Sequence, residues 1–112
     1  MPKSRPPASS LQGSLEMLIL KSLTLGPMHG YAISQHIGKL SDEVLKVEQG
    51  SLYPALDRLQ REGWVTSAWK ATPTGRHARY YTITTSGKKQ LGLKVSEYDR
   101  IALAIARVIR GA

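Results

Sequence analysis

Side chains that can bond phosphates or base edges gather in two short stretches of the sequence. They are Gln49, Ser51, Tyr53 and Arg58 in the first stretch, and Lys70, Arg76 and Arg79 in the second. Arg and Lys pair with phosphate, and Gln, Ser, Tyr and Arg also reach the edges of bases. No carboxylate occurs from residue 70 to residue 89. The pattern predicts a surface for a polyanion, and nucleic acid is the first candidate.

The net charge agrees with this interpretation. Sixteen Lys and Arg residues against eight Asp and Glu residues leave +8 on 112 residues. Such a field concentrates polyanions at the surface, although a basic surface can also serve only solubility. The distribution favours a one-sided field, because Asp42, Glu43 and Glu48 cluster away from the basic stretch.

Several function classes are disfavoured by what the sequence lacks. Without Cys there is no disulfide, thiolate zinc site or cysteine nucleophile, which fits a reducing cytosol. His29, His36 and His77 show no metal-ligand spacing with a carboxylate, and no phosphate loop or hydrolase-type Ser motif occurs. The longest apolar run, residues 17–20, is too short to cross a membrane, and no signal peptide is visible. We expect a soluble cytoplasmic protein that is not an enzyme and needs no cofactor or metal.

The length and the 41% hydrophobic content indicate one compact domain. Residues 1–10, with Pro2, Pro6 and Pro7 among basic and Ser residues, predict a flexible basic arm. Apolar residues at helical spacing predict a helix between residues 11 and 25, which Gly26-Pro27 ends.

Two more helices are expected, over residues 29–40 and 51–62. The buried stripe of the first is Tyr31, Ile33, Ile37 and Leu40, and that of the second is Leu52, Leu56 and Leu59. Pro54 is compatible with a helix if it lies in the first turn, where its missing N–H has no partner to lose.

A β-hairpin and a long helix complete the chain. Strands over residues 64–70 and 79–84 flank a turn-forming stretch at 71–75, and hydroxyl residues at 84–86 can cap a helix that continues to about residue 110. A mainly α chain with a small β-hairpin in this order is typical of a winged helix-turn-helix, here over residues 11–85. In that fold the third helix enters the major groove and the hairpin reaches a neighbouring groove or the backbone.

This layout makes the two polar stretches candidate DNA contacts, with alternatives left open. Ser51 can instead be only a helix cap, and Tyr53 can be only a packing residue. Arg76 and Arg79 flank the turn of the hairpin, where no core needs them, and Lys70 lies beside it. A merely solvated loop is the alternative there. The aromatic residues of the hairpin are expected to be buried, which disfavours an RNA-binding sheet as the rival function.

The last helix, residues 86–112, carries an apolar stripe of its own. Its members are Leu91, Val95, Tyr98, Ala102, Ile105 and Ile109. Steps of 4, 3, 4, 3 and 4 residues form the heptad pattern of a helix pair, so we expect a dimerisation helix. The alternative is that the stripe covers the body of its own domain. A two-fold dimer would present its third helices to DNA half-sites about 34 Å apart, in an inverted repeat.

Four segments resemble the PadR family of bacterial regulators in content, order and spacing. They are GPMHGYAI at 26–33, GSLYPAL at 50–56, EGWV at 62–65 and RYYTITTSG at 79–87. The resemblance covers residues 11–90 and implies a homodimeric transcription factor, usually a repressor, that binds a palindromic operator with its third helix and wing. It also implies Ser51 and Tyr53 at the DNA and Tyr81 as a packing residue of the wing. Members of the family are often released by a small effector, which here would have to bind between the subunits near Tyr98.

Overall fold

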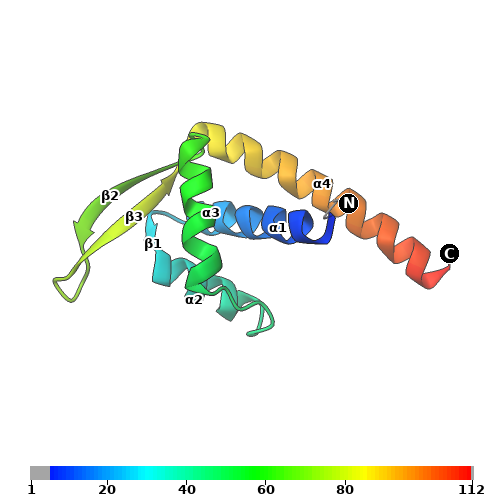
Figure 1. Cartoon of the computed structure of the whole chain (residues 1–112), viewed down its shortest axis with the longest axis horizontal. Helices are drawn as coiled ribbons and strands as arrows, with labels where there is room; N and C mark the ends of the chain where they lie inside the picture. The colour runs from blue at the N-terminus through cyan, green and yellow to red at the C-terminus, as the bar shows by residue number, and fades with distance from the viewer. Residues whose placement is uncertain (1–5, 112) are drawn as a thin grey trace.

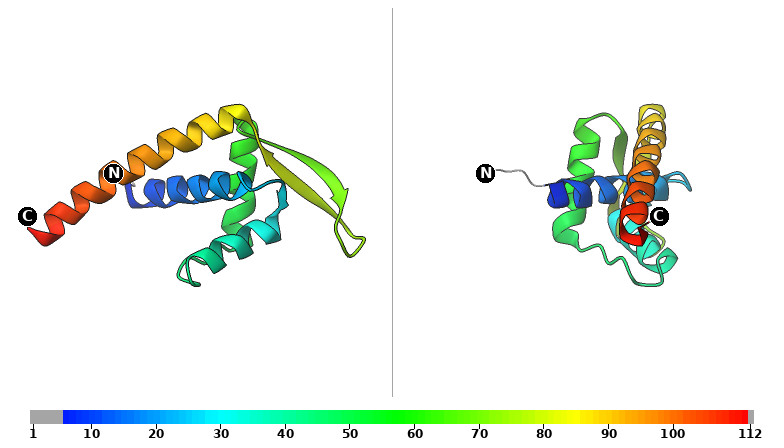
Figure 2. Two further views of the ribbon diagram at one scale, coloured as in Figure 1. Left: turned by 180° about the vertical axis from the view of Figure 1, so that it is seen from behind. Right: turned by 90° about the vertical axis from the view of Figure 1, so that its right-hand side faces the viewer.

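The computed structural model describes residues 6–111, with side chains from residue 14 onward. Its elements are α1 (Pro6–Leu23), β1 (Met28–His29), α2 (Gly30–Leu40), α3 (Gln49–Arg61), β2 (Val65–Ala71), β3 (His77–Ile83) and α4 (Thr85–Arg110) (Figure 1). The predicted class, mainly helical with a small β structure and a winged-helix arrangement, is confirmed. The described part measures 55 × 29 × 29 Å, because the C-terminal part of α4 extends past α1 (Figures 1 and 2). None of the helices within residues 6–111 is long and apolar enough to cross a membrane.

The core lies where α1, α2 and α3 meet the base of the sheet. Its buried side chains are Ile19, Leu20, Leu23, Ile33, Ile37, Leu52, Ala55, Leu56, Leu59, Val65, Tyr81 and Ile83. The predicted stripe of α3 is confirmed, because all three of its leucines are buried. The predicted stripe of α2 is wrong at its two ends, since Tyr31 is 58% exposed and Leu40 is 75% exposed. Helical spacing alone does not show how far along α2 the neighbouring helices reach.

The sheet has three antiparallel strands in the order β1-β3-β2. β2 and β3 form the predicted hairpin, in which Val65 pairs with Ile83 and Ala71 pairs with His77. β1 was not predicted, because the sequence analysis assigned His29 to the second helix. A two-residue strand has no periodicity of its own, and this one exists because His29 pairs with Tyr80.

Several helix starts differ from the prediction. α1 begins at Pro6, so the part of the predicted arm within residues 6–10 is helical, and residues 1–5 lie outside the described residues. His29 caps α2, since its Nδ1 accepts a hydrogen bond from Ala32 N at 3.2 Å. α3 begins at Gln49 after Glu48, so Ser51 lies inside the helix and is not its cap. Pro54 therefore lies in the second turn of α3, where it removes one bond of the helix ladder.

The start of α4 is tied to the base of the hairpin. Thr84 caps the helix as predicted, with its Oγ1 accepting from Gly87 N at 3.0 Å. The same Oγ1 donates to the Gly63 carbonyl at 2.8 Å, and Thr84 N donates to the Trp64 carbonyl at 3.0 Å. These bonds set the direction in which α4 leaves the domain.

Candidate nucleic-acid interface

The outer face of α3 is polar. Opposite the buried leucines, Gln49 and Ser51 are exposed at the start of the helix, and Tyr53 is 43% exposed one turn further. Asp57 and Arg61 follow on the outer face and form an exposed ion pair, with 3.1 Å between Oδ2 and Nη1. The structure thus brings three of the four residues predicted from this helix onto its accessible surface.

Tyr53 has a defined position against α2. Its Oη lies only 2.5 Å from the place where a Cβ on Gly30 would stand, and Cζ lies 2.8 Å from it. Gly30 is buried, and its missing side chain makes room for the ring. Tyr53 therefore packs on one side and is accessible on the other, and its contact with DNA stays a prediction.

Arg58, also in the predicted contact set, forms an ion pair within the chain, and its contact with DNA stays a prediction. Its Nε donates to Glu16 Oε2 at 3.0 Å, and Lys94 Nζ lies 3.3 Å from the other oxygen of that carboxylate. The Glu16 side chain is only 15% exposed. Arg58 therefore links α3 to α1. Its place was missed because a 42-residue separation hides the pairing with Glu16 from any local pattern.

The hairpin carries its basic residues in three different settings. Arg76 is exposed in the turn, next to Gly75, whose φ of +90° favours glycine there. Lys70 is exposed on β2, with its Nζ 5.7 Å from the centre of the Tyr80 ring. Tyr80 in turn meets His29 edge to face, with ring centres 5.3 Å apart. The hairpin face that carries Lys70 and Tyr80 therefore contacts His29 of β1, and it differs from the opposite face.

Arg79 belongs to the opposite face and is half-buried. Its Nε donates to Ser67 Oγ at 2.8 Å, and Ser67 Oγ donates to Gln60 Oε1 on α3 at 3.0 Å. The guanidinium carbon lies 5.6 Å from the centre of the Trp69 ring. Arg79 is thus more constrained than a free wing-tip cation.

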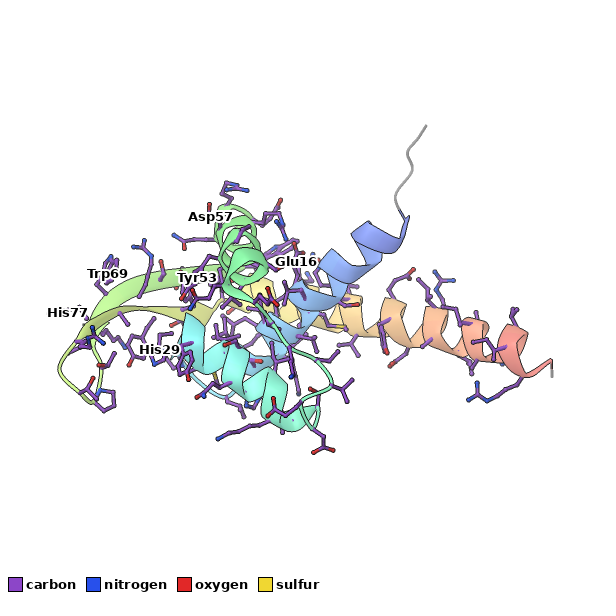
Figure 3. All side chains as sticks on the ribbon, turned by 60° about the horizontal axis from the view of Figure 1, so that its bottom comes forward. Glu16, His29, Tyr53, Asp57, Trp69 and His77 are labelled. Carbon is purple, nitrogen blue, oxygen red and sulfur yellow. The ribbon has the colours of Figure 1, made fainter. Side chains whose placement is uncertain are left out.

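Trp69 is a surface residue that the sequence analysis missed. The expectation that the aromatic residues of the hairpin are buried is wrong here, because Trp69 is 64% exposed. Strand alternation from buried Val65 through Ser67 could have placed Trp69 on the same face, two positions beyond the core. Figure 3 shows Tyr53, Asp57 and Trp69 on one side of the hairpin and His29 on the other.

Tyr81 lies buried between these elements. It is 6% exposed, in agreement with the packing role that the resemblance implies. Burial raises the pKa of its phenol, Arg79 opposes this, and nearby Tyr53 and Asp57 add to it. These electrostatic neighbours show that α3 and the hairpin meet at Tyr81. We call the surface formed by Tyr53, Asp57, Gln60, Ser67, Trp69 and Arg79 around it the helix–wing corner.

The face of α4 offers a second candidate surface. Of the predicted stripe, Leu91 is partly buried against the core of its own chain, as the alternative of a stripe that covers its own domain implies, and its place in a dimer interface stays a prediction. Val95, Tyr98, Ile105 and Ile109 are between 38% and 71% exposed. Further exposed apolar residues of α4 are Leu93, Ile101, Leu103 and Val108, of which Ile101 and Val108 lie beside the stripe. A groove of about 790 Å³ runs along this face and reaches Ser14 and Met17 of α1.

Comparisons with known proteins agree with this architecture. A family model described as the transcriptional regulator PadR-like family matches residues 19–93. The chain belongs to the PadR-like family of transcriptional regulators. This confirms the resemblance seen in the four sequence segments.

Individual transcriptional regulators match over most of the chain. The structure of a transcriptional regulator from Clostridium thermocellum is 28% identical with a TM-score of 0.80, over 88% of this chain and 96% of that one. A PadR-like regulator from Bacillus cereus is 29% identical with a TM-score of 0.76, over 93% and 99%. The negative transcriptional regulator PadR of Bacillus subtilis is 30% identical over 77 residues, which are 69% of this chain and 42% of that protein.

Proposed function

We propose that this PadR-like regulator binds an inverted-repeat DNA operator as a homodimer and represses transcription from it. The observation that carries the proposal is the polar outer face of α3 beside a hairpin that is basic and free of carboxylates. The proposed contacts are Gln49, Ser51, Tyr53, Lys70, Arg76 and Arg79. Arg58 also stays in the proposed set, because Glu16 accepts only from its Nε, four N–H donors remain, and its side chain is 31% exposed. Because its operator lies on the bacterial chromosome, the proposed location of the protein is the cytoplasm.

Dimerisation is supported by the exposed apolar face of α4. A helix that leaves Tyr98, Ile105 and Ile109 more than half exposed presents a large apolar surface to water. Surfaces of that kind mark interfaces in soluble proteins. Residues 86–112 are therefore proposed as the dimerisation segment and residues 11–85 as the DNA-binding domain.

Repression and effector control have separate support. The Bacillus subtilis relative is called a negative regulator, which favours repression here. The groove along α4 has an apolar lining, with Tyr98 among its residues, and would be enclosed further by a second subunit. A small molecule bound there could relieve repression by changing how the two subunits pack.

The proposal is tested by selecting bound fragments from the source genome and measuring binding to the recovered site. We expect an inverted repeat whose half-sites lie about one helical turn apart. Changing Arg76 to Ala should weaken binding and lower the slope of log K against log salt by about 0.9 for the lost phosphate contact. Arg107→Ala is the control, because it removes the same charge at the far end of α4 from the hairpin.

The dimer is tested by sedimentation of the wild type and of Ile105→Asp. Ile105 is 53% exposed, so the change leaves the domain core untouched. We expect a wild-type dimer and a folded monomeric variant with weakened operator binding. A wild-type monomer at micromolar concentration that binds no selected fragment contradicts the proposal.

A further inference from the structure

Trp69 is an exposed aromatic residue held in a fixed position. With 64% of its surface exposed, the indole has no packing role in the core of this chain. The Arg79 guanidinium lies over its ring at 5.6 Å, within the range of a cation–π contact. A large apolar side chain that is both exposed and positioned suits an intermolecular contact.

A chain of hydrogen bonds connects this indole to α3. Arg79 Nε donates to Ser67 Oγ, and the Ser67 hydroxyl donates onward to Gln60 Oε1. The direction of donation is the same at both steps, so the serine hydroxyl is satisfied as acceptor and as donor. The position of the Trp69 ring therefore depends on α3, through Gln60, as well as on the hairpin.

The charge around Trp69 selects the partner. Arg79 lies over its ring and Arg76 lies in the adjoining turn, while Lys70 lies on the opposite face of the hairpin, and residues 70–89 hold no carboxylate. Only the Nε donor of Arg79 is used by Ser67, and a guanidinium has four further N–H donors. A phosphate can bind these donors while the deoxyribose beside it packs on the apolar indole.

We propose that Trp69 is a DNA-contact residue that packs against the sugar–phosphate backbone of the duplex beside the bases faced by α3. The inference rests on the proposed DNA-binding function and adds to it an uncharged contact positioned by the Gln60–Ser67–Arg79 chain. An uncharged contact strengthens binding without changing how many counterions the protein releases.

The two tryptophans allow a direct test. Trp64, half-buried with Lys94 Nζ 5.4 Å from its ring centre, is the other tryptophan of the sequence. Trp64→Phe leaves Trp69 as the single indole fluorophore, and Trp69→Phe leaves Trp64. On adding the selected duplex, acrylamide quenching of Trp69 should fall at least twofold, while quenching of Trp64 should change little.

Affinity and its salt dependence complete the experiment. Trp69→Ala should lower affinity for the duplex by about tenfold with an unchanged salt slope, and Trp69→Phe should lie between it and the wild type. The thermal midpoint of each free variant should match the wild type, because the residue is exposed.

The outcomes separate this inference from the proposed function. A wild-type protein that binds its duplex while Trp69 stays fully accessible to acrylamide, or while Trp69→Ala binds equally well, overturns the inference alone. Protection of Trp69 by single-stranded oligonucleotide and not by duplex also overturns it, since base stacking would then be its role. A wild type that binds no DNA removes the proposed function and the inference together.

Discussion

Gly87 offers a sharp test of how α4 packs against the base of the hairpin. It lies in the first turn of α4 and is buried. A Cβ at this position would overlap the carbonyl oxygen of Trp64 and would stand 2.8 Å from Ile83 Cγ1. We expect Gly87→Ala to destabilise the protein, although alanine is the better helix former.

The magnitude follows from what must move. The Trp64 carbonyl is the acceptor of the 3.0 Å bond from Thr84 N, so displacing it weakens a bond worth about 1 kcal/mol. Crowding a packed site such as that around Ile83 costs about 1–3 kcal/mol. The helix propensity of alanine returns about 1 kcal/mol. A net loss of about 2 kcal/mol in the free energy of unfolding is expected.

Gly92→Ala is the matched control in the same helix. Nothing lies within 4 Å of a Cβ at Gly92, so this variant should gain up to about 1 kcal/mol from helix propensity alone. Both variants are compared with the wild type by urea unfolding followed by circular dichroism. Equal protein concentrations are used, because the stability of the proposed dimer depends on concentration. If Gly87→Ala is as stable as Gly92→Ala, the packing of α4 against Trp64 is not as described.

Three further predictions concern α3 and its surroundings. Gly30→Ala should displace the Tyr53 ring and lower operator affinity by about tenfold while stability changes by less than about 1 kcal/mol; unchanged affinity in a gel-shift titration would remove Tyr53 from the interface. Glu16→Gln should lower the free energy of unfolding in urea by about 1–2 kcal/mol, because the two partly buried cations Arg58 and Lys94 lose their shared carboxylate. A loss below about 0.5 kcal/mol, which is typical of a surface ion pair, would show that solvent screens these ion pairs. Because the pKa of Tyr81 is raised in the folded protein, its phenol ionises first in the unfolded chain, so the free energy of unfolding should fall as the pH rises above about 10. Tyr81→Phe should show a smaller fall between about pH 8 and about pH 10.5, and parallel curves of unfolding free energy against pH would contradict the inferred burial of the phenol.

Much of the fold could be predicted because it follows from local patterns. Leucines at helical spacing bury one face of α3, and strand residues on either side of a turn form the hairpin. Thr84 caps α4 as its hydroxyl and position suggest. Each of these signals depends on residues within a few positions of one another.

Local patterns could not show contacts between residues far apart in the sequence. Arg58 pairs with Glu16, 42 residues earlier. Leu91 fits a heptad stripe, and the body of the domain also covers it in part. β1 exists only because β3 pairs with it, and neither Met28 nor His29 indicates this pairing in the sequence.

The sequence by itself determined the kinds of elements, their order, the excess of positive charge and the family resemblance, since propensity, periodicity and composition are local quantities. The tertiary structure alone decided which polar side chains remain accessible. Arg58 pairs with the carboxylate of Glu16 and is only partly exposed, whereas Trp69 is mostly exposed because it lies beyond the end of the core. Exposure depends on which distant surfaces meet, and this is set by the packing of whole elements.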